Sequence, residues 1–164
     1  MTRQQESLNR KLRNALIAAV FVVMIPVWLP VVLVSFVLYG AVRLLLHFLI
    51  VFAWLPTGKD MLLVYSDSPI WHDYMTANII PLVKDRAVIL NSSERKKWRR
   101  YSLPVVAFRL IGGYRNFNPL VIHFRPLRPS RSFRFWPAFK EWKQGRPEPV
   151  EELRRQLQAV VRSR

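Results

Sequence analysis

The sequence predicts an α/β protein in which a long apolar N-terminal segment precedes a small basic domain. Residues 15–56 contain one formally charged side chain, Arg43. Residues 61–164 alternate short apolar runs, bounded by turn residues, with stretches of helical periodicity. The 164 residues leave room for one modest domain and an anchor. We therefore expect four parts: a basic flank (1–14), a membrane segment (15–56), a hinge (57–60) and a basic α/β domain (61–164).

The charge balance and the absence of cysteine limit the chemistry. Lys and Arg number 26 against 10 Asp and Glu, a formal net charge of +16. A chain this basic is expected to meet a polyanion, which can be nucleic acid, an acidic protein or anionic lipid headgroups. The lack of cysteine excludes disulfides, thiol catalysis and cysteine-ligated zinc, and it is consistent with a reducing compartment. We expect neither a cofactor nor a metal.

The membrane segment is about twice as long as the roughly 20 residues of one crossing. It is also too long for the apolar core of a secretory signal peptide, which has about 7–15 residues. Three arrangements remain open. Two short helices can form a hairpin that turns near residues 39–41; one helix can span to about Val37 and be followed by an interfacial helix; or Pro26 and Pro30 can bend the helix into a re-entrant wedge, since proline breaks the helical hydrogen-bond ladder.

Charge on both sides of this segment favours a hairpin or a wedge. Four basic residues precede it, and 21 Lys and Arg follow it against 9 Asp and Glu. Basic flanks stay in the cytoplasm, so we expect both termini and the domain on the cytoplasmic side of a bacterial-type inner membrane. Arg43 and His47 are the polar side chains inside the segment. They require an interfacial, aqueous or protein-lined position.

Local patterns predict four strands and three helical stretches in the basic domain. The strands are 61–66, 86–91, 119–124 and 131–136. Ser68 and Pro69 are expected to cap and begin a helix to about residue 82, and Ser92 or Ser93 to cap a second, interrupted near Pro104 and ended at Gly112. The last helix is 150–161. Helical crossovers imply parallel pairing, whereas the short loop between the last two strands implies an antiparallel hairpin.

This β-α-β-α-β-β-α order resembles the thioredoxin fold over about residues 61–161, and "FNPLVIHF" resembles that fold's cis-proline entry into a strand. The resemblance implies that Pro119 is the cis-proline, that residues 68–71 take the place of the redox C-x-x-C, and that 150–161 is the closing helix. Because both cysteines are absent, the resemblance implies the shape and not the redox chemistry. The competing fold is an open Rossmann-like sheet of the nucleotide-sugar transferase type.

Polar residues follow the first two predicted strands, where ligands bind in open α/β sheets and where helix N-termini attract anions. They are Ser66, Asp67 and Ser68 after the first strand, and Asn91, Ser92, Ser93 and Glu94 after the second. Ordinary helix capping explains both clusters, and a ligand site that includes Pro119 is the alternative. His72 and Asp73 fall on an exposed helix face, and with His47 and His123 they give no metal-ligand spacing.

Two basic stretches are candidates for binding anionic lipid or a partner. "RKKWRR" would form a cationic helix face around one aromatic side chain; its members are Arg95, Lys96, Lys97, Trp98, Arg99 and Arg100. "FRPLRPSRSFR" places an arginine at every third position; these are Arg125, Arg128, Arg131 and Arg134. An extended loop would align them along a polyproline II helix, and a basic hairpin tip is the ordinary alternative, which we favour. Most aromatic residues of "FRFWPAFKEW" are expected to be core, and the strand at its start, at or near a sheet edge, is also a candidate partner-binding surface.

These features favour a non-enzymatic accessory or scaffold subunit of a larger membrane protein complex, whose domain also contacts anionic lipids. No nucleophile–base pair or metal set stands out in the sequence. The alternative is a membrane-associated transferase that acts on a phosphate-bearing lipid or nucleotide-sugar, with Asp67 or Glu94 near the sheet and arginines on the phosphates. A membrane-tethered nucleic-acid binder is supported by charge alone, so nucleic acid is the least expected partner.

Overall fold

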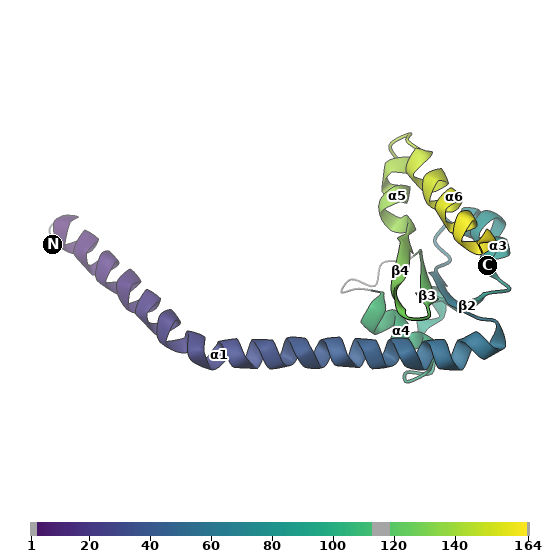
Figure 1. Cartoon of the computed structure of the whole chain (residues 1–164). Coiled ribbons are helices and arrows are strands. Elements are labelled where there is room, and N and C mark those ends of the chain that lie inside the picture. The colour runs from purple at the N-terminus through teal and green to yellow at the C-terminus, as the bar shows by residue number, and fades with distance from the viewer. Residues whose placement is uncertain (1–2, 113–118, 164) are drawn as a thin grey trace. The chain divides into compact units, whose positions relative to one another are not determined.

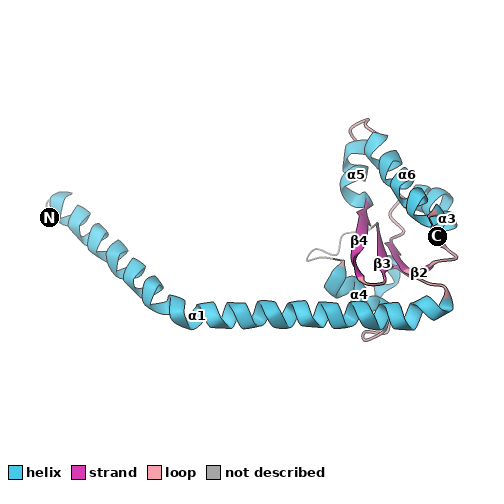
Figure 2. Cartoon of the chain, viewed as in Figure 1, coloured by secondary structure: helices cyan, strands magenta, loops and turns pink. Residues whose placement is uncertain are grey.

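The structure, a computed structural model, describes residues 3–112 and 119–163. The chain forms two compact units, Met1–Val42 and Arg43–Arg164. The first unit is helical, and the second contains a mixed sheet with helices on both of its faces (Figures 1 and 2). The α/β class and the long apolar helix expected from the sequence are therefore both present.

The apolar segment is one helix, α1 (Arg3–Trp54). Residues 39–41, where a hairpin turn was expected, are helical, because the apolar sequence around them offers neither a capping side chain nor a second helix breaker beside Gly40. Pro26 and Pro30 lie inside α1, and the helix bends once in its N-terminal half (Figure 1). By length and composition, α1 is the one helix in the described residues that is able to cross a membrane.

The last turns of α1 belong to the core of the second unit. Leu46, Ile50 and Trp54 are buried, with Ile50 fully inaccessible, and their spacing of four places them on one helix face. Trp54 packs edge-on against Phe124 with ring centroids 5.6 Å apart. The sequence placed these residues in the membrane segment, because a core helix and a membrane helix are both apolar. The folded unit thus begins before the expected hinge at residues 57–60.

A short 3-10 turn, Leu55–Thr57, connects α1 to the sheet. Gly58 follows with φ +74°, a left-handed conformation that glycine adopts without steric cost. The Thr57 hydroxyl donates a 2.7 Å hydrogen bond to the Trp54 carbonyl. These contacts end the helix and turn the chain directly into β1.

The sheet has the strand order β2-β1-β3-β4. Its strands are β1 (Met61–Tyr65), β2 (Ala87–Asn91), β3 (Leu120–Arg125) and β4 (Arg128–Arg134). β1 and β2 are parallel and β3–β4 is an antiparallel hairpin, and both pairings confirm the prediction. β3, however, runs antiparallel to β1, so the expectation that every helical crossover joins parallel strands was wrong. Leu120 pairs with Val64, which means that the chain re-enters the sheet at the end where β1 stops.

Both faces of the sheet are covered. Met61 and Leu63 face one cluster, and Leu62 and Val64 face the other, as expected from the two-residue period of a strand. All four side chains are fully buried, which explains the uninterrupted apolar run of β1. α5 (Phe135–Trp142) and α6 (Glu148–Arg162) lie on the first face, while α4 (Leu103–Ile111) and the end of α1 lie on the second (Figure 2).

The helices that cover the first face differ from the expected ranges. The helix after β1 begins at His72 and not at Ser68; it consists of α2 (His72–Tyr74), a π-helical turn (Met75–Ile79) and α3 (Ile80–Val83). The fourth predicted strand, 131–136, overlaps β4, which lies at the sheet edge as expected, but it ends at Arg134. The aromatic run continues as α5 (Phe135–Trp142), whose buried Phe135, Ala138 and Phe139 recur at helical spacing and confirm the expected core role of most of its aromatics. α6 (Glu148–Arg162) confirms the last predicted helix with three more residues.

The end of α1 provides a test of this core. Ile50→Ala should lower the free energy of unfolding by about 2–5 kcal/mol, because it leaves a cavity at a fully buried site. Leu49→Ala is the matched control, since Leu49 precedes Ile50 in the same helix turn and is 52% exposed. Denaturant titration of the full chain in detergent, followed by near-UV circular dichroism, measures both. Equal effects of the two substitutions would contradict the core position of residues 46–54.

Candidate functional site

Parallel pairing brings the polar residues after β1 and β2 together. Tyr65 pairs with Asn91 at the carboxyl ends of the two strands. The Asp67 N–H donates to Ser93 Oγ at 2.9 Å, the Ser93 N–H donates to Asn91 Oδ1 at 3.0 Å, and Asn91 Nδ2 donates to Asp67 Oδ1 at 2.8 Å. These three residues, Asp67, Asn91 and Ser93, close a cycle of hydrogen bonds that we call the strand-end ring. The ring ties the two loops to each other.

Two aromatic residues lie beside the ring. Nδ1 of His72 is 3.5 Å from Asp67 Oδ1, which is longer than a good hydrogen bond, and both side chains are more than a third exposed. Nε1 of Trp71 donates to Ser66 Oγ at 3.3 Å. A carboxylate next to an imidazole is a pairing suited to acid–base chemistry. In the ring, however, Oδ1 of this carboxylate already accepts a hydrogen bond from Asn91.

The other strand-end candidates have backbone or surface roles. Ser68 accepts hydrogen bonds from Trp71 and His72 through its carbonyl, and no side chain caps the helix, so the expected hydroxyl cap was wrong. Asn91, not Ser92 or Ser93, caps the following 3-10 turn (Ser92–Lys97). In that turn Glu94 pairs with Lys97 at 2.6 Å. Pro119 is buried at the same end of the sheet, and its carbonyl accepts from the Phe135 N–H.

The first basic stretch does not form the expected cationic helix. The 3-10 turn ends at Lys97, and the backbone at Trp98 is extended. The Trp98 indole points inward: its Nε1 donates to the Asn91 carbonyl at 3.0 Å, and its ring meets Phe108 edge-on. Arg95 lies over both rings, about 6 Å from each centroid. Trp98 is therefore a packing residue, while the basic side chains around it are exposed: Arg95, Lys96, Lys97, Arg99 and Arg100.

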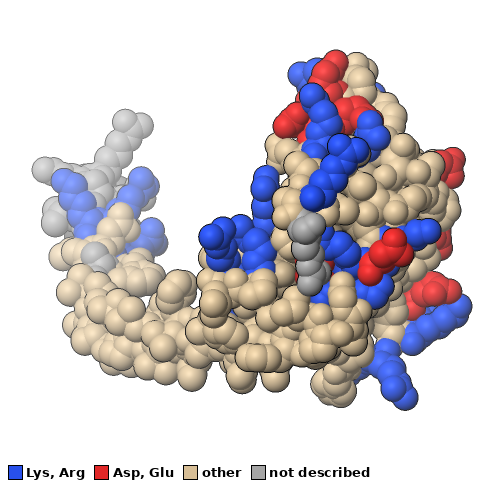
Figure 3. Space-filling model, turned by 45° about the vertical axis from the view of Figure 1, so that its right-hand side comes forward, with Lys and Arg blue, Asp and Glu red and all other residues tan. Residues whose placement is uncertain are grey.

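The second basic stretch forms the β3–β4 hairpin, which confirms the expected hairpin tip, and it does not form an extended polyproline helix. Because successive side chains of a strand point to opposite faces, Arg131 and Arg134 lie on different sides of β4. Arg131 stacks over Phe133 at 4.8 Å and donates to Gln156. Arg125 donates from Nε and Nη2 to the Pro129 carbonyl, and Arg128 is exposed at the turn. On the face seen in Figure 3, Lys and Arg are scattered and form no single stripe.

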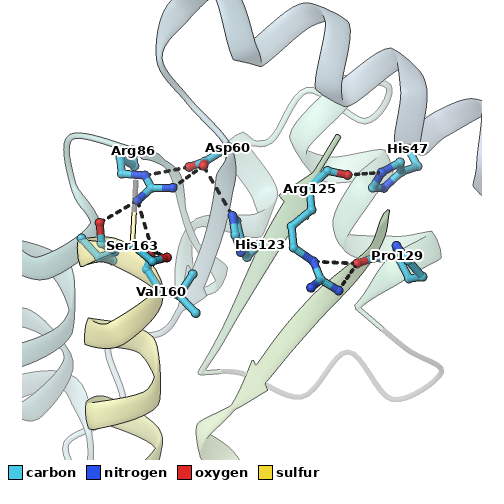
Figure 4. Close-up of polar contacts among 9 residues, drawn as sticks. His47, Asp60, Arg86, His123, Arg125, Pro129, Val160 and Ser163 are labelled. Atoms are coloured by element: carbon cyan, nitrogen blue, oxygen red, sulfur yellow. Dashed lines mark hydrogen bonds and ion pairs between the residues drawn. The ribbon is translucent and has the colours of Figure 1, made fainter. Parts of the chain in front are cut away.

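The side chains expected inside the membrane segment both fall in the second unit. His47 is half-buried, and its Nε2 lies 3.0 Å from the Arg125 carbonyl, so that it joins the end of α1 to β3 (Figure 4). Its ring also lies 6.0 Å from the ring of Phe124. Arg43 is the first residue of this unit and is exposed. A protein-lined position therefore accounts for His47.

The most buried charge of the described residues was missed by the sequence analysis. Asp60, placed in the expected hinge, is 6% exposed and receives hydrogen bonds from both Nε and Nη2 of Arg86 (Figure 4). Nε2 of His123 lies 3.5 Å from the same carboxylate. Nη1 of Arg86 donates to the Val161 carbonyl at 2.8 Å, at the end of α6. The sequence signal that could have identified Asp60 is its position as a single acid directly before the buried strand β1.

Charge keeps Asp60 ionised despite its burial. Burial by itself raises the pKa of this carboxyl, but the hydrogen bonds and positive charge of His123 and Arg86 outweigh it and hold the pKa at about 2. Such a network is a structural clamp. In the described residues no group of three or more His, Cys, Asp or Glu side chains is arranged to hold a metal ion.

Comparisons with family models, with curated proteins and with solved structures gave no match. The function therefore has to be argued from the geometry of the chain itself.

The Asp60 clamp predicts a specific sensitivity to acid. Because the folded pKa lies below the ordinary value of 3.8, its contribution is complete above pH 3.8 and is lost as the pH falls toward about 2. The loss should amount to about 2 kcal/mol of unfolding free energy. Denaturant titrations of the wild type and Asp60→Asn across this range measure it.

In that experiment the Asn variant should be less stable than the wild type above pH 3.8, and the difference should shrink as the pH falls toward about 2, since the Asn side chain does not titrate. Asp85→Asn is the control, because Asp85 is an exposed acid next to Arg86 in the sequence. A pH profile of Asp60→Asn that parallels the wild-type profile would contradict the assignment.

Proposed function

We propose that this chain is a non-enzymatic accessory subunit of a membrane protein complex. α1 anchors it in a bacterial-type inner membrane, and the basic domain faces the cytoplasm, beside anionic lipid. The observation that carries the proposal is the strand-end ring. Asp67, Asn91 and Ser93 are the side chains best placed to serve a ligand, and they bind one another instead. Their arrangement is what a structural role requires.

We further propose that the domain is a thioredoxin-like fold without redox activity. The support is the parallel pair β1–β2 joined by a helical crossover, followed by the β3–β4 hairpin and a closing helix, α6. The antiparallel β3 argues against the competing Rossmann-like sheet, whose strands are mostly parallel. With no cysteine in the chain, such a domain is suited to binding and not to thiol exchange.

We propose that α1 enters the membrane in one of two forms: a bent helix that re-enters the same side, or a helix that spans the bilayer. Residues 14–42 carry no formal charge and exceed the roughly 20 residues of one crossing. Pro26 and Pro30 supply the bend of the re-entrant form, which keeps the basic flanks on one side. The exposed basic side chains of the domain then lie next to anionic headgroups, which attract each Lys or Arg by about 1 kcal/mol.

One observation favours the second candidate, a transferase acting on a phosphate-bearing lipid or nucleotide-sugar. His72 Nδ1 lies 3.5 Å from Asp67 Oδ1, at the edge of the sheet where α/β enzymes bind ligands. In this alternative Asp67 orients the imidazole as a general base. The two candidates therefore differ in whether the negative charge of Asp67 is needed.

Asp67→Asn separates them, because an asparagine Oδ1 still accepts from Asn91 while the carboxylate charge is lost. For a subunit, the tagged full chain purified in mild detergent should retain one partner in fixed stoichiometry, equally for wild type and Asp67→Asn. Asp67→Ala breaks the ring and should reduce the amount of assembled chain. The ability of the wild type and of both variants to restore the function of a strain that lacks this protein is measured in the same series.

The enzyme is indicated if Asp67→Asn loses complementation while its abundance and assembly equal those of the wild type. His72→Gln should then have the same effect. The absence of any stoichiometric partner in purifications of the wild type would count against the subunit.

A further inference from the structure

An apolar groove lies between the end of α1 and the tip of the β3–β4 hairpin. It has a volume of about 520 Å³ and is lined only by apolar residues. We call this surface the hairpin patch; it consists of Phe48, Val51, Phe52, Leu55, Pro56, Pro126 and Leu127. All of it belongs to the second unit. Its most protruding side chains are Phe52, 75% exposed, and Leu127, 90% exposed.

Leu127 has an unfavourable backbone conformation that no contact among the described residues explains. It is the described non-glycine residue with positive φ, at +57°, in the two-residue turn between β3 and β4. Turns of this length favour glycine or asparagine at such positions, and a bulky side chain is disfavoured there. Because Leu127 buries only a tenth of its surface in the chain, its contacts do not offset that cost. A strained, exposed leucine points to a contact outside the chain.

The neighbouring helix surface identifies that contact as lipid. The last turns of α1 bury one face in the core, while Leu45, Leu49 and Phe52 on the other face remain more than half exposed. This exposed stripe continues, in the same helix, the apolar segment that precedes Arg43. An apolar face that is covalently continuous with a membrane anchor is already beside the bilayer, so lipid reaches it before any soluble partner does.

Arginines on both sides of the turn match the layer above the acyl chains. Arg125 and Arg128 flank Pro126 and Leu127 in the sequence. The two hydrogen bonds from Arg125 to the Pro129 carbonyl hold its guanidinium beside the hairpin (Figure 4). Apolar side chains that point into the interface, with arginines at the level of the phosphates, are typical of interfacial membrane contacts.

We propose that the hairpin patch is a second membrane-contact site. Leu127 and the outer face of residues 44–55 enter the interfacial layer, Arg125 and Arg128 bind phospholipid phosphates, and the domain is held against an anionic membrane. The proposal rests on the anchoring role of α1 described above, and it adds that the folded domain itself touches the bilayer.

The absence of native cysteine permits a direct test in the full chain. Single cysteines replace Val34 in α1, Ser130 next to the hairpin tip, or Gln144, which is exposed between α5 and α6. Each carries an environment-sensitive fluorophore in vesicles of equal parts phosphatidylcholine and phosphatidylglycerol, with or without a spin-labelled lipid quencher. We expect quenching at positions 34 and 130 and none at 144.

Leu127→Gly is the matched variant. Glycine adopts the positive φ without strain, so the thermal unfolding temperature of the chain in detergent should not fall. In vesicles the variant should reduce quenching at position 130 to the level of position 144, with position 34 unchanged. In vesicles of phosphatidylcholine alone, quenching at 130 should weaken, because the phosphate-binding arginines then lack an anionic surface.

The outcomes separate the two proposals. Quenching at 34 without quenching at 130 overturns the hairpin patch and leaves the anchor in place. No quenching at either position overturns both. Quenching at 130 that survives Leu127→Gly shows that another surface approaches the membrane and overturns the role of the tip. Quenching at 130 that is equal in both lipid mixtures overturns the role given to Arg125 and Arg128.

Discussion

The carboxylate of Asp60 joins four elements of the second unit, and the packing of the sheet depends on it. Asp60 precedes β1, Arg86 precedes β2, and His123 lies in β3. Arg86 binds the carboxylate through Nε and Nη2, and its Nη1 donates to a carbonyl at the end of α6. Backbone hydrogen bonds follow the same path: the Asp60 N–H donates to the Arg86 carbonyl, and the Phe124 N–H donates to the Asp60 carbonyl. A cation at a helix C-terminus is itself favourable, so Arg86 serves the carboxylate and α6 together. Removing Asp60 would take from Arg86 its carboxylate partner, and removing Arg86 would leave the buried Asp60 without the guanidinium charge that lowers its pKa.

With one end of the sheet held by this clamp, the two faces can be covered by unlike elements. Helices α5 and α6 come from the domain itself, whereas the opposite face receives the last turns of α1. The helix that we propose as the anchor thus also completes a core. His47 shows how the junction is made specific, since its ring reaches the Arg125 carbonyl across 78 positions of sequence.

The strand-end ring lies at the other end of the sheet and has a different character. Its hydrogen bonds are exposed, its members are neutral apart from Asp67, and each contributes one donor and one acceptor. Hydrogen bonds of this kind individually stabilise by about 1 kcal/mol, which suits the fastening of two loops. This geometry agrees with the proposed binding or scaffolding subunit, and the apolar hairpin patch, flanked in the sequence by Arg125 and Arg128, agrees with the proposed contact with a membrane surface.

Several features were predictable because they depend on local periodicity or on composition. The run of β1, the hairpin of β3 and β4, the final helix and the apolar character of α1 all follow from patterns within ten to twenty residues. The presence of polar residues at the ends of β1 and β2 was likewise readable from the sequence, as was their proximity if the strands pair in parallel. In the polar cluster after β2 a helix cap was correctly expected, but the capping residue was wrong, since Asn91 and not Ser92 or Ser93 accepts the hydrogen bond.

The remaining features depend on contacts between residues far apart in the chain. The apolar sequence of residues 46–54 fits a membrane helix and a helix of a protein core equally well. Only the packing of these residues on the sheet distinguishes the two. The direction of β3 depends on which end of the sheet the chain re-enters, which periodicity does not encode. Trp98 turned inward because Phe108 and the Asn91 carbonyl lie within its reach. By itself the sequence determined the chemical character of each segment; the tertiary structure decided which of those segments face protein, because burial is a property of neighbours and not of residues.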